Sequence, residues 1–214
     1  EGEGFRQMLI TLDSGRISIG AMALGLAQAA LDAAVAYSKE RVQFGQPIAR
    51  FQAIQWMIAD MAKDTAAARL LVEAAAAKLD RGERATLESS YAKCFASDAA
   101  VLHTQNAVQI HGGSGYIRGV VVERLYRDAK ITQIYEGTNQ IQRMIIARQL
   151  LEAACAGFKA QGFTTAEAYV LKGAEGDAMN YPGPLAMYLA AGFEVTREAC
   201  CDGDDTLIVR KQLA

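Results

Sequence analysis

The stretch that decides the fold runs from Arg16 to Arg41 and reads RISIGAMALGLAQAALDAAVAYSKER. Residues recur in it at alternating steps of four and three, the spacing of one face of an α-helix. This face carries Ile17, Ala21, Leu24, Gln28, Leu31 and Val35. Because Met22, Leu26 and two alanines form a second apolar face, we expect this helix to be buried on more than one side.

The same spacing continues along the next hundred residues, which contain a single proline, Pro47, before the tail begins. Long helices need such stretches, since an internal proline removes a backbone donor and clashes with the preceding turn. After the first helix, over residues 16–41, we predict helices over residues 51–79, 85–110, 120–129 and 138–154. Glycines at the intervening breaks fit helix ends. The predicted fold class is mainly α, an antiparallel helical bundle.

Beyond residue 151 the sequence pattern changes. Residues 163–171, 193–198 and 206–211 are typical of strands, residues 184–191 of a short helix ended by Gly192, and Asp202-Gly203 of a turn. The order is β-α-β-β, a small α/β segment. We place a boundary near residues 152–160, which gives two domains, 1–154 and 160–214.

Composition excludes several classes of protein. The chain has 214 residues, of which 51% are hydrophobic and 21% charged, with a net charge of −2. This balance is typical of a globular protein and gives no electrostatic reason to bind nucleic acid or an anionic membrane. The most apolar stretch, residues 19–36, is interrupted by Gln28 and Asp32, so we predict no transmembrane helix.

Cysteine spacing and the N-terminal residues carry further expectations. Cys94, Cys155, Cys200 and Cys201 form no CxxC pair and have no paired histidines nearby, which argues against a zinc site and for a reducing compartment. We expect no metal. The start, residues 1–4, is acidic and lacks an initiator Met; it does not resemble a signal peptide, and we expect the chain to be a fragment.

Seven short motifs stand in an order that is specific as a set. They are Glu3-Gly4-Phe5, Leu12-Asp13-Ser14-Gly15-Arg16, Arg41-Val42-Gln43-Phe44-Gly45, Gln52, Gln109-Ile110-His111-Gly112-Gly113-Ser114-Gly115-Tyr116, Arg127-Asp128-Ala129-Lys130 and Tyr135-Glu136-Gly137-Thr138. Each is short and weak alone. Together, over residues 1–151, they closely resemble the C-terminal helical domain of the flavin-dependent acyl-CoA dehydrogenases.

The resemblance implies that Glu136 is the catalytic base of an acyl-CoA dehydrogenation, with Tyr135 and Gly137 beside the acyl thioester. An unperturbed Glu, with a pKa of about 4.3, is a weak base toward a carbon acid, so the site must desolvate it and acidify the substrate. Without the resemblance, a Glu before a helix is most often a solvated residue near the helix dipole.

The resemblance also implies FAD as the cofactor. Its contacts would be Arg41, Phe44, Gln52, Gln109, Gly112, Gly113, Thr138 and Gln140. A guanidinium at position 41 would suit phosphate oxygens, and the glycines would let backbone amides come close to FAD from a neighbouring subunit. The alternatives are a surface charge for Arg41, a helix stop for the glycines and an N-cap for Thr138; His111 is expected to be structural.

By the same resemblance, Asp13 and Arg16 would face the CoA part of the substrate. The implied partners are an acyl-CoA, an electron-transferring flavoprotein as acceptor and further copies of the chain in a homodimer or homotetramer, in a cytoplasmic setting. Dehydrogenases of this kind also have an N-terminal helical domain and a middle β domain. We therefore expect the 214-residue chain by itself to bind FAD weakly and to lack turnover.

The tail resembles the C-terminal end of a GNAT-type N-acetyltransferase, where a Tyr four residues before Gly-Phe, here Tyr188, acts as a general acid. The expected pyrophosphate loop upstream is absent, so Tyr188 is expected to be a packing residue. Two other functions remain open: a helical oligomerisation module without chemistry, in which Glu136 has no role, and an acetyltransferase that depends on Tyr188.

Overall fold

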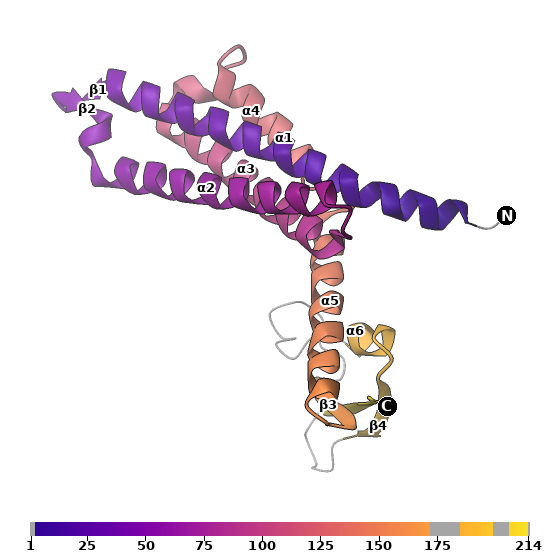
Figure 1. The fold of residues 1–214 in the computed structure, drawn as a ribbon. Coiled ribbons are helices and arrows are strands. Elements are labelled where there is room, and N and C mark those ends of the chain that lie inside the picture. The colour runs from indigo at the N-terminus through magenta and orange to yellow at the C-terminus, as the bar shows by residue number, and fades with distance from the viewer. Residues whose placement is uncertain (1–2, 172–184, 199–205, 214) are drawn as a thin grey trace. The chain divides into compact units, whose positions relative to one another are not determined.

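The computed structural model describes residues 3–171, 185–198 and 206–213. They fall into two compact units, Glu1–Arg143 and Met144–Ala214, which are described separately. The helices of the first unit are α1 (Gly4–Glu40), α2 (Gln52–Asp80), α3 (Thr86–His111) and α4 (Val121–Ile131), with the first residues of α5 (Asn139–Ala160), as Figure 1 shows. The prediction of a mainly helical bundle is confirmed.

Consecutive helices of the first unit run in opposite directions. Helices α2 and α3 are joined at one end by the ion pair between Lys78 and Glu88 (2.6 Å) and farther along by Thr65 and His103 (3.3 Å). Helix α1 runs parallel to α3 as a consequence. The C-terminal ends of α1 and α3 meet where the rings of Tyr37 and His111 stack with centroids 4.1 Å apart.

Helix α1 begins at Gly4, twelve residues earlier than the predicted start at Arg16. The pair Asp13-Ser14 followed by Gly15 resembles a helix start, but these residues lie inside the helix. Its C-terminal end agrees within one residue, because Arg41 adopts an extended conformation (φ −70°, ψ 118°). The other helices begin and end within two residues of prediction, except that α5 continues to Ala160.

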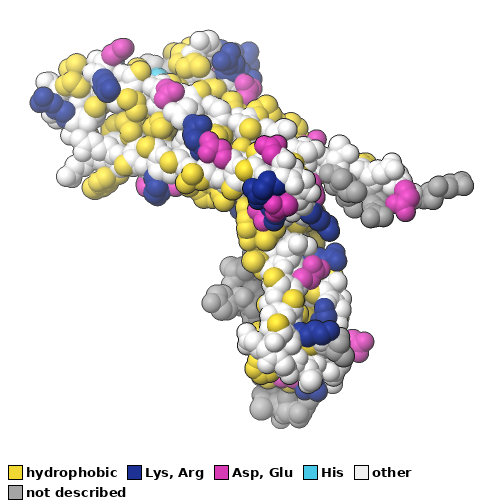
Figure 2. Space-filling view, in the orientation of Figure 1, with side chains coloured by type: hydrophobic (Ala, Val, Ile, Leu, Met, Phe, Trp, Pro, Cys, Tyr) yellow, Lys and Arg dark blue, Asp and Glu magenta, His cyan; other side chains and the backbone are white. Residues whose placement is uncertain are grey.

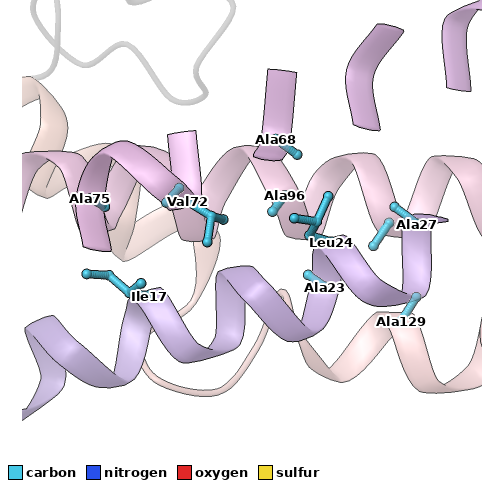
Figure 3. Close-up of a cluster of buried hydrophobic side chains, with 11 residues drawn as sticks. Ile17, Ala23, Leu24, Ala27, Ala68, Val72, Ala75, Ala96 and Ala129 are labelled. Carbon is cyan, nitrogen blue, oxygen red and sulfur yellow. The ribbon is translucent and has the colours of Figure 1, made fainter. Parts of the chain in front are cut away.

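Alanines dominate the first hydrophobic cluster of the bundle. Ala23 and Ala27 of α1 face Ala68 of α2 and Ala96 of α3, and all four are fully buried, as Figure 3 shows. Methyl groups let the helix axes approach closely. Gly20 belongs to the same contact, because a Cβ there would lie 3.3 Å from both the Ala92 carbonyl carbon and Val72 Cγ2.

A second cluster toward the other end of the bundle uses larger side chains. Met61 is fully buried in it, together with Ile48, Ile110, Val122 and Leu125. Leu26 of α1 packs against both the alanine cluster and this cluster and so links them.

One segment of α1, Thr11–Glu40, is long and apolar enough to cross a membrane, with a mean hydropathy of 1.6. This is a property of length and composition alone, so the prediction that the chain has no transmembrane helix stays a prediction. The core helix of a bundle can be equally long and apolar. This segment is such a core helix, because Ala23, Ala27, Ala30 and Ala34 are fully buried.

A small hairpin joins α1 to α2. Strands β1 (Val42–Gln43) and β2 (Gln46–Pro47) pair antiparallel, followed by the short helix η1 (Ile48–Arg50). The two turn residues, Phe44 (φ 51°) and Gly45 (φ 77°), both have positive φ, as in a type I′ hairpin turn. A second short helix, η2 (Gly112–Tyr116), follows α3.

The second unit contains most of α5, a three-stranded antiparallel sheet and helix α6 (Leu185–Ala190). The strands are β3 (Thr165–Leu171), β4 (Glu194–Glu198) and β5 (Thr206–Gln212), in the order β3-β5-β4. Val170, Val209, Phe193 and Tyr188 form its buried cluster with Cys155 of α5. The predicted β-α-β-β order is confirmed. The predicted turn at Asp202-Gly203, the segment 181–184 and Cys200 and Cys201 lie outside the described residues.

Candidate active site

The turn between α4 and α5 carries the predicted base. Helix α4 ends at Ile131, and Thr132 closes it by donating its hydroxyl to the Ala129 carbonyl oxygen (2.6 Å). The amide of Asn139 then donates to the Gln133 carbonyl oxygen (3.0 Å), which closes the turn. Glu136 lies inside it at φ 54°. A left-handed conformation is unfavourable for a residue with a side chain and occurs in turns and at strained functional sites.

The carboxylate of Glu136 lies against a glycine of α1. A Cβ on Gly15 would come within 2.7 Å of Glu136 Oε2 and 3.2 Å of its Cδ. Glu136 is half-buried. A glycine here therefore makes room for the carboxylate beside the helix backbone, which brings residues 121 positions apart in the chain into contact.

Arg16 and Asp13 lie on α1 near this carboxylate. Arg16 is only 5% exposed and pairs with Asp13 (2.7 Å), which also accepts a hydrogen bond from the Thr86 hydroxyl at the start of α3 (2.6 Å). Within the described part of the chain, Nε of Arg16 has no hydrogen-bond partner although it is buried. A buried guanidinium with an unused donor suits an oxygen atom of a ligand.

The aromatic neighbour of the base is also anchored to α1. The Tyr135 hydroxyl contacts the sulfur of Met22 (3.8 Å). Burial, followed by the charge of Glu136, raises the pKa of Tyr135 above its ordinary value. Gly137, at φ 87°, lies against Gln142, since a Cβ there would meet Gln142 Nε2 at 2.7 Å. A glycine is therefore favoured at position 137 by the close packing of Gln142, apart from any contact with a substrate.

Thr138 and Gln140 lie at the start of α5. The Ile141 amide lies 3.4 Å from the Thr138 hydroxyl oxygen, the geometry of an N-cap, so the alternative role of Thr138 is present in the structure. Gln140 is exposed. The turn and its flanking residues therefore bring seven predicted site residues to one end of the bundle: Asp13, Arg16, Tyr135, Glu136, Gly137, Thr138 and Gln140.

A polar network with the fully buried Lys93 and Gln142 lies beneath the turn and was missed by sequence reasoning. The ammonium of Lys93, on α3, donates to the Gly137 carbonyl oxygen (2.9 Å) and to Asn139 Oδ1 (2.7 Å). Gln142 Nε2 donates to the carbonyl oxygens of Glu136 (3.3 Å) and Gly137 (3.0 Å). The signal in the sequence is a lysine between Ala92 and Cys94, within a run of small buried residues.

The other predicted cofactor residues lie at the opposite end of the bundle. Arg41, Phe44 and Gln52 surround the β1–β2 hairpin, and all three are exposed. Phe44 is 92% exposed with its ring edge against Phe51 (6.1 Å between centroids). No ion pair to Arg41 occurs among the described residues. An unpaired guanidinium beside an exposed aromatic ring fits a phosphate next to a planar ring system.

Gln109, Gly112 and Gly113 reach the same end of the bundle from α3. Gly112 has φ 60°, and a Cβ on either glycine would meet no atom within 4 Å. Their backbone is therefore open to a ligand. His111 donates from Nδ1 to the Ala107 carbonyl oxygen (2.8 Å) and stacks on Tyr37, as expected of a structural histidine.

The two groups of predicted residues are far apart in one chain. Glu40 lies 25 positions after Gly15 on α1, which corresponds to about 37 Å at 1.5 Å per residue. The residues around Glu136 and the residues around the β1–β2 hairpin therefore form two separate surfaces at opposite ends of the bundle.

Burial of Lys93 leads to a testable dependence of stability on pH. Desolvation is the largest cause that lowers the pKa of this lysine to about 8, while Asp98 and Glu136 oppose the shift. Between pH 8 and 10.5 the unfolded chain holds this proton and the folded chain loses it. The free energy of unfolding should therefore rise with pH in this window, by at most about 1.4 kcal/mol per pH unit.

Urea unfolding of the wild type and of Lys93→Met, measured from pH 7 to 10.5, checks this expectation. The difference in unfolding free energy between the two proteins should be flat below pH 8 and shift in favour of the wild type above it. A flat difference across the whole range would contradict a depressed pKa.

Comparison with known proteins adds to this geometry. Residues 2–151 match the family described as acyl-CoA dehydrogenase, C-terminal domain. "Probable acyl-CoA dehydrogenase YngJ" of Bacillus subtilis is 57% identical over 150 residues, 70% of this chain and 40% of the relative. The structure of butyryl-CoA dehydrogenase from Megasphaera elsdenii superposes with a TM-score of 0.70 at 52% identity and covers 71% of this chain and 39% of that one.

A third match is a chain in a solved structure described as electron transferring flavoprotein of Acidaminococcus fermentans. It is 55% identical, has a TM-score of 0.70 and covers 71% of this chain and 40% of that one. The chain thus spans about 40% of the length of the proteins that it matches.

Proposed function

This chain belongs to the acyl-CoA dehydrogenase family through its C-terminal domain, residues 2–151, and on that premise we propose that Glu136 is the base of an FAD-dependent oxidation of acyl-CoA thioesters. The observation that carries the proposal is the position of Glu136. Its carboxylate is half-buried in a strained turn, against Gly15 and near the buried Arg16. These contacts support a role in chemistry for Glu136 over that of a solvated residue at a helix start.

In the proposed reaction, Glu136 takes a proton from the carbon next to the thioester carbonyl. A hydride from the adjacent carbon passes to the flavin, which is the chemistry that FAD supplies when bound. The pair Asp13 and Arg16 would bind the CoA portion, where the unused Nε of Arg16 can donate to an oxygen. Tyr135 and Gly137 would border the acyl thioester.

The residues at the hairpin end would hold a different part of the cofactor. Arg41 would face phosphate, with Phe44 and Gln52 beside it, and Gln109, Gly112 and Gly113 would bring open backbone to the adenine side. Because about 37 Å of helix separates this end from Glu136, we propose that these residues serve the FAD of a neighbouring copy. Thr138 and Gln140 would contact the FAD that Glu136 faces.

A homodimer or homotetramer follows from this division of the site between copies. The exposed side chain of Trp56 on α2 (65% exposed) supports such contacts. Figure 2 shows hydrophobic side chains along the face of the bundle. An electron-transferring flavoprotein is the proposed acceptor, supported by the similar chain in the Acidaminococcus fermentans structure. The free, buried Cys94 and Cys155 support a reducing compartment such as the bacterial cytoplasm.

The tail is proposed to be a partial GNAT-like segment. Its β-α-β-β order supports the proposal. Tyr188 is buried against Phe193, edge to face at 5.4 Å, and burial raises the pKa of its hydroxyl. These contacts favour a packing role over acid catalysis. We place the two domains at residues 1–154 and 160–214.

A chimaera tests the proposed function. In it, residues 2–151 replace the matching segment of Megasphaera elsdenii butyryl-CoA dehydrogenase, so that the rest of the relative supplies the remaining walls of the site. We expect the chimaera to bind FAD and to oxidise butyryl-CoA with a dye as electron acceptor. The 214-residue protein, measured in parallel, should bind FAD weakly and show no turnover. A folded chimaera with bound FAD but no oxidation would oppose the proposal.

A further inference from the structure

The turn that carries Glu136 must be held in place by something outside it. Glu136 is left-handed at φ 54° and Gly137 follows at φ 87°. Such a conformation costs a residue with a side chain on the order of 1 kcal/mol or more, and persists only when its surroundings fix it. The carboxylate reaches Gly15 only while this conformation lasts, because the backbone of residue 136 sets the direction of its Cα–Cβ bond.

Lys93 is the charged group placed to fix the turn. Its side chain is fully buried, which is rare for lysine and unfavourable unless its donors are satisfied. Two donors are satisfied by the Gly137 carbonyl oxygen and Asn139 Oδ1. Both acceptors belong to the segment that begins at Glu136, whereas the lysine belongs to the middle of α3.

Asn139 also ties the turn to α3. Its Nδ2 donates to Ser97 Oγ (2.8 Å) and to Asp98 Oδ1 (2.7 Å), both on α3. Its backbone amide closes the turn onto Gln133. One side chain therefore joins the lysine, the helix and the closing hydrogen bond.

The charges around the ammonium come from three elements. Arg16 of α1 opposes its positive charge, while Cys94 and Asp98 of α3 and Glu136 of the turn favour it. The neutral amine still donates to both acceptors, so the geometric role does not depend on protonation.

We propose that Lys93 is a positioning residue, which holds the turn in the conformation that directs the Glu136 carboxylate toward Gly15. An effect of Lys93 on catalysis is expected only if the proposed function is correct. The effect of Lys93 on the conformation of the turn does not depend on that function and can be measured in the protein without substrate.

Amide hydrogen exchange, followed by NMR in the 214-residue protein, tests the positioning. Lys93→Met keeps an unbranched, apolar stem, one atom shorter than that of lysine, but removes the donors. The amides of Asn139 and Gln142, which close the turn and the start of α5, should exchange at least about tenfold faster, corresponding to about 1.4 kcal/mol. The amides of α2 should change less than twofold.

His103→Gln is the matched control. His103 is likewise buried on α3, 1% exposed, but contacts Thr65 of α2 instead of the turn. Its replacement should leave unchanged the ratio between the exchange rates of the turn amides and those of the helix amides. Unchanged exchange of the Asn139 amide in Lys93→Met, or an equal acceleration in all helices, would overturn the positioning role.

The chimaera provides the catalytic readout. A displaced base slows chemistry but leaves CoA binding intact, so Lys93→Met should lower kcat by about 10²-fold with KM changed less than threefold. A rise in KM with kcat unchanged would overturn the assignment. If Glu136→Gln leaves the chimaera active, the proposed function fails, whereas the exchange result still reports on the turn.

Discussion

Replacing Glu136 by Gln in the chimaera should reduce butyryl-CoA oxidation by about 10³- to 10⁴-fold, the upper range for loss of a general base. The amide has the shape of the carboxylate and can still lie against Gly15, but it has no lone pair basic enough to accept the substrate proton. The effect should fall on kcat, because the group acts on the proton in transit rather than on CoA. Steady-state kinetics with a dye acceptor measure it.

Two controls make the result specific to position 136. Glu123→Gln removes a carboxylate from α4 that pairs with the exposed Arg127, and should leave kcat within about twofold. The flavin absorbance of Glu136→Gln should equal that of the parent, which shows that FAD binding survives. If instead Glu136→Gln retained full activity, the domain would be a helical oligomerisation module and the carboxylate would have no chemical role.

The fold could be predicted from the sequence wherever periodicity decides it. Helices α2, α3 and α4 were predicted within two residues, because their apolar spacing and the glycines at their ends agree. The start of α1 was wrong because Asp13 and Gly15 resemble start signals. Both have tertiary reasons to be there: Asp13 pairs with Arg16 and Thr86, and Gly15 leaves room for Glu136.

The candidate site could be predicted only in part. Motif order indicated Glu136 and its neighbours, but not that Arg41 and Phe44 lie at the other end of the bundle, since separation in space depends on how α1 and α3 run. Lys93 was not found because its partners, Gly137 and Asn139, are more than 40 residues away, and a lysine in a helix is ordinarily exposed. The roles of these residues stay predictions.

In the tail, too, the individual elements could be predicted from the sequence, whereas their arrangement in the sheet could not. Its strands and short helix were predicted from alternation and turn residues. The placement of β5 between β3 and β4 was not, because pairing between strands depends on contacts over 40 residues apart. For example, Ala168 pairs with Val209.

The second large effect concerns stability. Met61→Ala should lower the free energy of unfolding of the first unit by about 3 kcal/mol, within the range of 2–5 kcal/mol for a fully buried Met. Met61 has no exposed surface and lies in the cluster of larger side chains with Ile48 and Ile110. Long helices on all sides restrict collapse around the missing atoms, so a cavity should persist.

Leu70→Ala is the matched control, because Leu70 lies on the same helix but is 68% exposed. Its replacement should change the free energy of unfolding by less than about 0.5 kcal/mol. Urea unfolding followed by circular dichroism at 222 nm compares the two variants, with equal m-values required for the comparison. Equal losses of unfolding free energy in the two variants would mean that α2 does not bury the face on which Met61 lies. The packing that places α3 and Lys93 beneath the turn would then be wrong.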